Sequence, residues 1–172
     1  MNASLYAFIA SLLIITVLAQ ADTHDDQRME IGTASTLDFR AFDLGSFEKI
    51  VEAKRKQNHL VVLWSLDCPP CIKELQKISD LHLQFPEYQL TLINTDTLEN
   101  QGKAKEILQL YNLLDLENWG FTQTDAEKLR YDIDPRWFGD LPRSYFFPIQ
   151  GKIKRLRGAL SSAELLELFE PS

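Results

Sequence analysis

The most informative stretch of the sequence is Leu60-Val61-Val62-Leu63-Trp64-Ser65-Leu66-Asp67-Cys68-Pro69-Pro70-Cys71. Its first five residues form an apolar run of strand length, with β-branched side chains and no polar alternation. Such a run is typical of a central parallel strand that is covered on both faces of its sheet. The stretch therefore predicts a buried strand that leads directly into a C-x-x-C motif.

A helix is expected to begin at this motif. Apolar residues recur at near-helical spacing after it and the pattern ends before a proline: Ile72, Leu75, Ile78, Leu81, Leu83 and Pro86. Pro69 and Pro70 suit a first helical turn, whose N–H groups have no partner within the helix, and they stiffen the motif loop. Cys68 then lies at the helix start, where free N–H groups and the helix dipole favour the thiolate.

Cys68 is thus the candidate nucleophile, and Cys71, one turn further on, is placed to attack a mixed disulfide and release the product. Reactivity explains the pair better than stability, because a bridge over two intervening residues closes a very small loop. A zinc site needs two more ligands, and the sequence has no third cysteine and no paired histidine motif. A structural bridge and metal binding are the weaker alternatives, and neither a metal nor an organic cofactor is expected.

Strand and helix patterns alternate around this segment. Strands are expected over 37–42, 60–64, 88–94, 143–147 and 153–156, and helices over 47–56, from the motif to 85, over 98–114 and after Thr124 and Ser161. Ser46 is a candidate cap, and Thr124-x-x-Glu127 and Ser161-x-x-Glu164 are candidate capping boxes. This order predicts an α/β fold with a mostly parallel sheet, helices on both faces and a terminal hairpin.

The N-terminus has the layout of an export signal. Residues 5–19 are apolar and uncharged, and Ala19-Gln20-Ala21 is a small-x-small site followed by an acidic stretch. The run is shorter than the ~20 residues of a typical spanning helix. We expect residues 1–21 to be a signal peptide or an N-terminal membrane anchor, residues 22–36 a flexible leader and residues 37–172 the folded domain. Because residues 1–4 lack Lys and Arg, cleavage and anchoring through 5–19 both stay open.

Acidic residues outnumber basic ones, 25 to 18, for a formal net charge of −7. A nucleic acid or an anionic membrane surface needs a basic face, so neither is an expected partner.

The segment from Leu63 to Glu74 resembles the active-site segment of thioredoxin-like proteins, most of all the exported TlpA/ResA-type thiol–disulfide oxidoreductases. The segments 139–147 and 151–153 are similar to that group's cis-proline, strand and glycine turn. The resemblance covers roughly Leu37 to Phe169. It implies a thioredoxin-like fold, a central mixed β-sheet flanked by helices, with an insertion between the C-x-x-C helix and the cis-Pro strand.

The resemblance also implies roles for further residues. Pro142 would be cis, with the Leu141 backbone facing the sulfurs and pairing with an incoming peptide; an ordinary trans proline is the alternative. Glu74 matches an acidic residue of that group and would relay the proton that Cys71 loses. Its alternative is an exposed helix carboxylate paired with Lys73 or Lys77.

Asp67 and several aromatic residues also bear on the site. Asp67 stands where the group usually has Trp, and a carboxylate beside Cys68 disfavours the thiolate. Trp64 is expected in the core. Trp137 and Phe138, in an irregular segment like Trp119, are candidates for a peptide-receiving rim or for burial.

The sequence thus predicts an enzyme that exchanges disulfides with protein substrates in an exported compartment, the periplasm or the outer face of the inner membrane. The resemblance favours a reductant, which needs an unidentified redox partner to re-reduce it. The alternative is a non-catalytic thioredoxin-fold module that binds a peptide or partner. A peroxidase of the peroxiredoxin kind fits badly, because Val61 stands where that family has proline.

Overall fold

The computed structural model describes residues 39–122 and 125–170, and the candidate signal and leader segments lie outside these ranges. The described strands are β1 (Arg40–Phe42), β2 (His59–Trp64), β3 (Gln89–Asn94), β4 (Glu117–Phe121), β5 (Arg143–Phe147) and β6 (Lys154–Arg157). They form one sheet in the order β1-β4-β3-β2-β5-β6. The strands from β1 to β2 in this order are parallel, whereas β5 is antiparallel to β2 and β6 to β5. The predicted mixed sheet with a terminal hairpin is confirmed.

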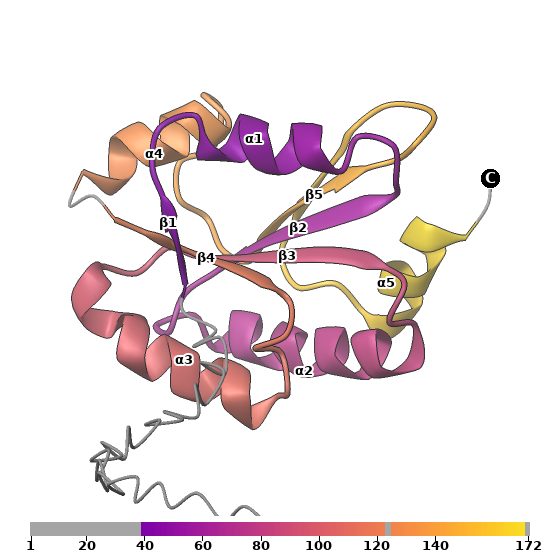
Figure 1. Cartoon of the computed structure of the whole chain (residues 1–172), viewed down its shortest axis with the longest axis horizontal. Coiled ribbons are helices and arrows are strands. Elements are labelled where there is room, and N and C mark those ends of the chain that lie inside the picture. The colour runs from indigo at the N-terminus through magenta and orange to yellow at the C-terminus, as the bar shows by residue number, and fades with distance from the viewer. Residues whose placement is uncertain (1–38, 123–124, 171–172) are drawn as a thin grey trace, which may run out of the picture. The chain divides into compact units, whose positions relative to one another are not determined.

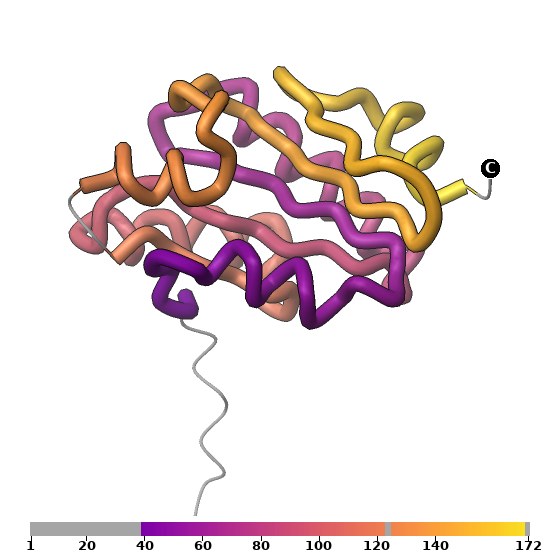
Figure 2. Tube along the Cα trace, turned by 90° about the horizontal axis from the view of Figure 1, so that it is seen from above, coloured from indigo at the N-terminus to yellow at the C-terminus, as the bar shows by residue number. Residues whose placement is uncertain are grey.

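Helices cover both faces of this sheet. They are α1 (Ser46–Ala53), α2 (Pro69–Gln84), the 3-10 turn η1 (Leu98–Asn100), α3 (Gln101–Leu110), α4 (Ala126–Ile133) and α5 (Ser162–Phe169). α1 and α4 lie on one face, and α2, α3 and α5 lie on the other (Figure 1). The tube seen from above shows β2 and β3 in the middle, with the β5–β6 hairpin beside β2 (Figure 2). In the described ranges, no helix has the length and apolar character needed to cross a membrane.

The central position of β2 explains the unbroken apolar run of its residues 60–64. All six of its residues are buried. Leu60, Val62 and Trp64 belong to the apolar cluster that includes α2, α3 and α5, whereas Val61 and Leu63 belong to the cluster under α1 and α4. Successive strand residues point to opposite faces, so a strand between two helical layers needs apolar side chains at every position.

The segment between α2 and β5 contains the main departure from the predicted elements. Glu117–Phe121 forms β4, which pairs with both β1 and β3, whereas Trp119 was expected in an irregular segment. Its sequence includes Asn and Gly, which strands usually avoid, so tertiary pairing rather than local propensity forms it. α3, β4 and α4 lie in the interval where the resemblance places an insertion.

The predicted single helix over 98–114 is wrong in its extent. It is divided into η1 and α3, and α3 ends at Leu110. Asn112 adopts a positive φ of 53°. The Leu113 N–H then donates to the Leu108 carbonyl at 2.8 Å, the bonding pattern that closes a helix with a left-handed residue.

Two of the predicted helix caps differ in detail. Gly45, at a φ of 78°, precedes α1, and Ser46 is the first helical residue, whose Oγ accepts from the Asp43 N–H. Asp125 caps α4 by accepting from the Lys128 N–H, and Thr124 lies outside the described residues. The capping box of Ser161 and Glu164 at α5 is confirmed.

Candidate active site

The two cysteines lie where β2 gives way to α2. Cys68 is the N-cap of α2, and Pro69 and Pro70 occupy its first two positions, as the sequence predicts. Cys68 and Cys71 form a disulfide with an S–S distance of 2.01 Å. The Cys71 N–H donates to Cys68 Sγ at 3.2 Å. This backbone N–H, the first that α2 offers after its two prolines, is thus already directed at the Cys68 sulfur.

Access distinguishes the two sulfurs. Cys68 is 8% exposed and Cys71 only 1%. The two prolines between the cysteines, Pro69 and Pro70, are exposed, so the motif lies at the surface. Cys68 is therefore the more exposed cysteine of the pair, and Cys71 is almost completely buried.

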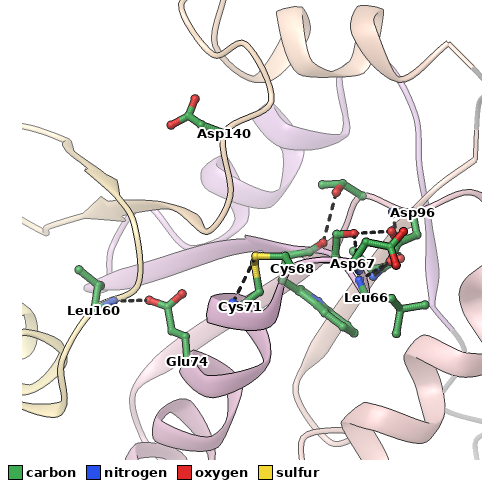
Figure 3. Close-up of a disulfide and its surroundings, with 12 residues drawn as sticks. Leu66, Asp67, Cys68, Cys71, Glu74, Asp96, Asp140 and Leu160 are labelled. Carbon is green, nitrogen blue, oxygen red and sulfur yellow. Dashed lines mark hydrogen bonds between the residues drawn. A yellow bond between two sulfur atoms is a disulfide. The ribbon is translucent and has the colours of Figure 1, made fainter.

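An acidic residue that the sequence analysis did not identify holds the loop before Cys68. The Asp96 carboxylate, just after β3, accepts hydrogen bonds from Ser65 Oγ at 2.5 Å and from the Leu66 N–H at 2.8 Å (Figure 3). Asn94 Nδ2 donates to the same carboxylate at 2.8 Å. The sequence pattern that could have identified Asp96 is Asn94-x-Asp96 at the end of an apolar strand. Neighbouring parallel strands end at the same edge of a sheet, so polar residues there lie near the end of β2. Asp67 itself is exposed, and its N–H donates to Ser65 Oγ.

The Leu141–Pro142 peptide bond is cis, as the resemblance implies. Pro142 is buried, and the next residue, Arg143, opposes Leu63 near the end of β2. This register places the cis-proline loop at the sheet edge where the cysteines emerge. The Gly158 N–H donates to the Pro142 carbonyl at 3.0 Å and ties the end of β6 to the loop.

The two aromatic residues before this loop are separated by the fold. Trp137 is 3% exposed, and its Nε1 donates to the Asp140 carbonyl at 2.9 Å. Phe138 is 89% exposed. Only Phe138 is therefore available as a rim residue, whereas Trp137 belongs to the core. Trp64 is fully buried, as expected.

Glu74 is a buried acid, which excludes the alternative of an exposed carboxylate paired with a lysine. The residue is 1% exposed, and its Oε1 accepts from the Leu160 N–H at 2.9 Å. Lys77 instead donates to the Leu160 carbonyl at 2.7 Å. Figure 3 shows the carboxyl group between Leu160 and Cys71, with its second oxygen on the side of the disulfide.

Burial sets the protonation of this acid. Desolvation raises the pKa of Glu74 from 4.5 to about 7, against the lowering effects of the Leu160 hydrogen bond and the Lys77 charge. Within the described residues, Glu74 Oε2 has no hydrogen-bond partner. A buried acid that titrates near neutral pH beside a disulfide can accept and return a proton. In the same part of the chain, no group of three or more His, Cys, Asp or Glu side chains is arranged to hold a metal ion.

No family model matches the chain, and no curated protein matches its sequence. Solved structures do match its fold. A secreted disulfide oxidoreductase from Mycobacterium tuberculosis, described as homologous to Escherichia coli DsbE, has a TM-score of 0.55 at 20% identity, over 69% of this chain and 84% of that one. A secreted thiol-disulfide isomerase from Corynebacterium glutamicum has a TM-score of 0.55 at 14% identity, over 70% and 72%.

A thiol:disulfide interchange protein of the thioredoxin family from Chlorobium tepidum is similar to the same extent. Its TM-score is 0.54 at 14% identity, over 69% of this chain and 81% of that one. At such identities the likeness concerns the fold, which agrees with the sheet order, the helix layers and the place of the motif. The chain has the thioredoxin-like fold, with Cys68 and Cys71 at the C-x-x-C position of that fold.

Proposed function

We propose that this protein is a thiol–disulfide oxidoreductase that reduces disulfides of protein substrates in an exported compartment. One observation carries the proposal: a cysteine pair at the start of a helix, with its first sulfur accessible, beside a cis-proline loop. Chemistry at such a pair needs no bound cofactor, because the two cysteine sulfurs supply both electrons.

In the first step, the Cys68 thiolate attacks one sulfur of the substrate disulfide. A bond forms between Cys68 Sγ and that sulfur, and the other substrate sulfur leaves as a thiolate. The N–H of Cys71, which lies 3.2 Å from Cys68 Sγ, stabilises the attacking thiolate.

In the second step, Cys71 loses its proton and attacks Cys68 Sγ. The mixed disulfide breaks, the second substrate sulfur leaves as a thiolate, and the protein retains a Cys68–Cys71 disulfide. Two electrons have then passed from the protein to the substrate. Glu74 accepts the Cys71 proton, a role supported by its pKa of about 7 and its position in α2 next to Cys71.

The substrate peptide lies along the cis-proline loop in this proposal. The backbone of Leu141, the residue before the cis Pro142, pairs with the peptide. Phe138, which is fully outside the core, offers an apolar contact at the rim of the same loop.

The exported location rests on the N-terminal pattern, and the secreted neighbours in the comparison support it. Residues 1–21 act as a signal peptide or as a membrane anchor through residues 5–19, with a leader over 22–36 and the catalytic domain over 37–172. The compartment is then the periplasm or the outer face of the inner membrane, where a dithiol partner re-reduces the protein.

The test is an insulin-reduction assay in dithiothreitol, combined with a redox titration of the Cys68–Cys71 couple in glutathione buffers. We expect the wild type to accelerate precipitation of the insulin chains and Cys68→Ser to abolish the effect. Cys71→Ser should accumulate a mixed disulfide that mass spectrometry detects. A wild type that binds disulfide peptides but gives no more turnover than Cys68→Ser would identify a non-catalytic binding module instead.

A further inference from the structure

Arginine side chains gather beside the cis-proline loop, around two aspartates. We call Arg136, Arg143, Arg155 and Arg157 the arginine cluster. Asp134 contacts three of them, at 3.4 Å from Arg136 Nε, 3.5 Å from Arg143 Nη2 and 3.1 Å from Arg155 Nε. Asp140 contacts Arg143 Nη1 at 3.7 Å and Arg157 Nε at 3.8 Å.

The pairing of β5 with β6 explains why these side chains meet. Arg143 opposes Arg157, and Tyr145 opposes Arg155. Residues two apart on a strand, and those directly opposite on its neighbour, share one face of the sheet. Because Gly158 donates to the Pro142 carbonyl, the Arg157 end of this row lies at the cis-proline loop. Figure 3 shows Asp140 on that loop, with its carboxylate directed away from the disulfide.

The cluster carries more positive charge than its own aspartates neutralise. Among the described contacts, four guanidinium groups share two carboxylates, which leaves an excess of two charges. The Asp134 side chain is 5% exposed and already serves three of the arginines. This local excess stands in a chain whose formal net charge is −7.

The contacts to Asp140 are the weak part of the network. Both exceed hydrogen-bond length, and the Asp140 side chain is 47% exposed. Within the described residues, Arg143 Nη1 has no hydrogen-bond partner, although its side chain is only 3% exposed. Arg157 and Arg155 present 67% and 44% of their side chains to solvent. Arg155 and Arg157 therefore offer exposed guanidinium groups to a further carboxylate, with the buried Arg143 charge behind them.

We propose that the arginine cluster binds an acidic segment of the substrate protein, next to the disulfide that Cys68 attacks. This inference rests on the proposed function and adds the class of substrate. Planar guanidinium groups match carboxylates in geometry, and they exchange one carboxylate partner for another without losing their charge. In this proposal, the side chains that flank the disulfide of a peptide paired with Leu141 reach Asp140 and Arg157. Acidic residues there speed the encounter and hold the substrate in register.

Three cyclic disulfide peptides of equal length serve as probes, with Glu, Gln or Lys on both sides of the disulfide. The second-order rate constant for their reduction by the reduced protein is measured by quenched-flow chromatography at low and high salt. We expect the Glu peptide to react about tenfold faster than the Lys peptide at low salt, with the ratio falling at high salt.

Arg155→Gln/Arg157→Gln should bring the ratio of the Glu and Lys rates close to one. The matched control is Arg55→Gln/Lys56→Gln, which removes the same charge near the start of β2, at the other end from the cysteines, and should keep the ratio. Arg157→Gln alone should give an intermediate ratio with unchanged thermal unfolding, because the Arg157 ion pair within the described ranges is a long one, at 3.8 Å.

The outcomes separate this inference from the function on which it rests. If all three peptides react equally fast, or if the double variant keeps the wild-type ratio, the acidic-substrate inference is overturned and the oxidoreductase remains. If no peptide reacts with the wild type, the proposed function fails and the inference fails with it.

Discussion

The Glu74 carboxylate accepts a 2.9 Å hydrogen bond from the Leu160 N–H, which joins the helix that carries the cysteines to the residue before the Ser161 cap of α5. One oxygen of the buried acid is therefore occupied, and the other lies on the side of the disulfide. This arrangement leads to separate expectations for the chemistry and for the stability of the protein.

Glu74→Gln should slow the second step of exchange more than the first. The amide cannot accept the Cys71 proton, so release of the substrate from the mixed disulfide should fall by about 10²-fold. In the wild type, the release rate should rise with pH through about 7, where Glu74 ionises, and the variant should lack this rise. Single-turnover quenched flow resolves the two steps. Equal rates of both steps in the two proteins would remove Glu74 from the proton path.

The raised pKa of Glu74 also makes folding depend on pH. The native state binds the Glu74 proton more tightly than the unfolded chain does. The free energy of unfolding is therefore highest while the acid is protonated in both states, and it falls as pH rises from 4.5 to about 7. The loss approaches about 3 kcal/mol for a shift of this size. The free energy of unfolding of the oxidised wild type and of Glu74→Gln can be measured in urea at pH 4.5 and pH 8. The difference between the two proteins should shift in favour of Glu74→Gln at the higher pH. A gap independent of pH would contradict this view of the buried carboxyl.

Asp96→Asn should loosen the loop that precedes Cys68. The substitution removes the charge from three hydrogen bonds, and one donor must lose its partner, which costs about 1.5–3 kcal/mol. Backbone amides of Leu66 and Asp67 should exchange faster with solvent, and the reduction potential of the cysteine pair should move. Asp80→Asn, at an exposed residue of α2, is the control for a lost surface carboxylate. An unchanged potential together with unchanged exchange at Leu66 would limit Asp96 to a passive role.

Gly120→Ala should destabilise β4, the strand between β1 and β3. A Cβ at this position would lie 2.6 Å from Gln101 Nε2, so Gln101 must move and its hydrogen bond to the Phe121 carbonyl is lost. We expect a loss of about 0.5–1 kcal/mol in the free energy of unfolding, because the colliding atom ends a flexible side chain and a single hydrogen bond is lost. Gln101→Ala in the same chain should recover part of this loss, because it removes the colliding atoms. Calorimetry of the two single variants and the double variant measures the coupling energy between positions 120 and 101. If the losses of the single variants simply add, a collision with Gln101 is not the cause of the destabilisation.

The features that the sequence predicts well are those that depend on neighbours along the chain. The apolar run of β2, the helix start at Cys68 and the β5–β6 hairpin each have a local pattern. β4 was missed because a strand with weak propensity is held by partners at Arg40 and Thr91, far away in the sequence. The burial of Glu74 was missed for the same reason, since Leu160, which covers it, lies 86 residues further on.

Asp96 is a site residue that can be predicted once the order of the parallel strands is known. Its role follows only when β3 is known to neighbour β2, because the two strand ends then meet. The arginine cluster depends in the same way on the register of β5 and β6, which brings Arg143 opposite Arg157. Residue patterns identify the reactive pair, and the sheet topology identifies the side chains around it.

The backbone of Leu160 is held on both sides of its Cα by side chains of one helix: its N–H donates to Glu74, and its carbonyl accepts from Lys77. Each proton that Glu74 gains or loses therefore alters the electron density around a single amide hydrogen. The chemical shift of the Leu160 amide hydrogen in a nitrogen-15 correlation spectrum should therefore report the charge on Glu74. Followed during turnover, it reports the proton's arrival from inside the folded molecule, without any added dye or label near the sulfurs.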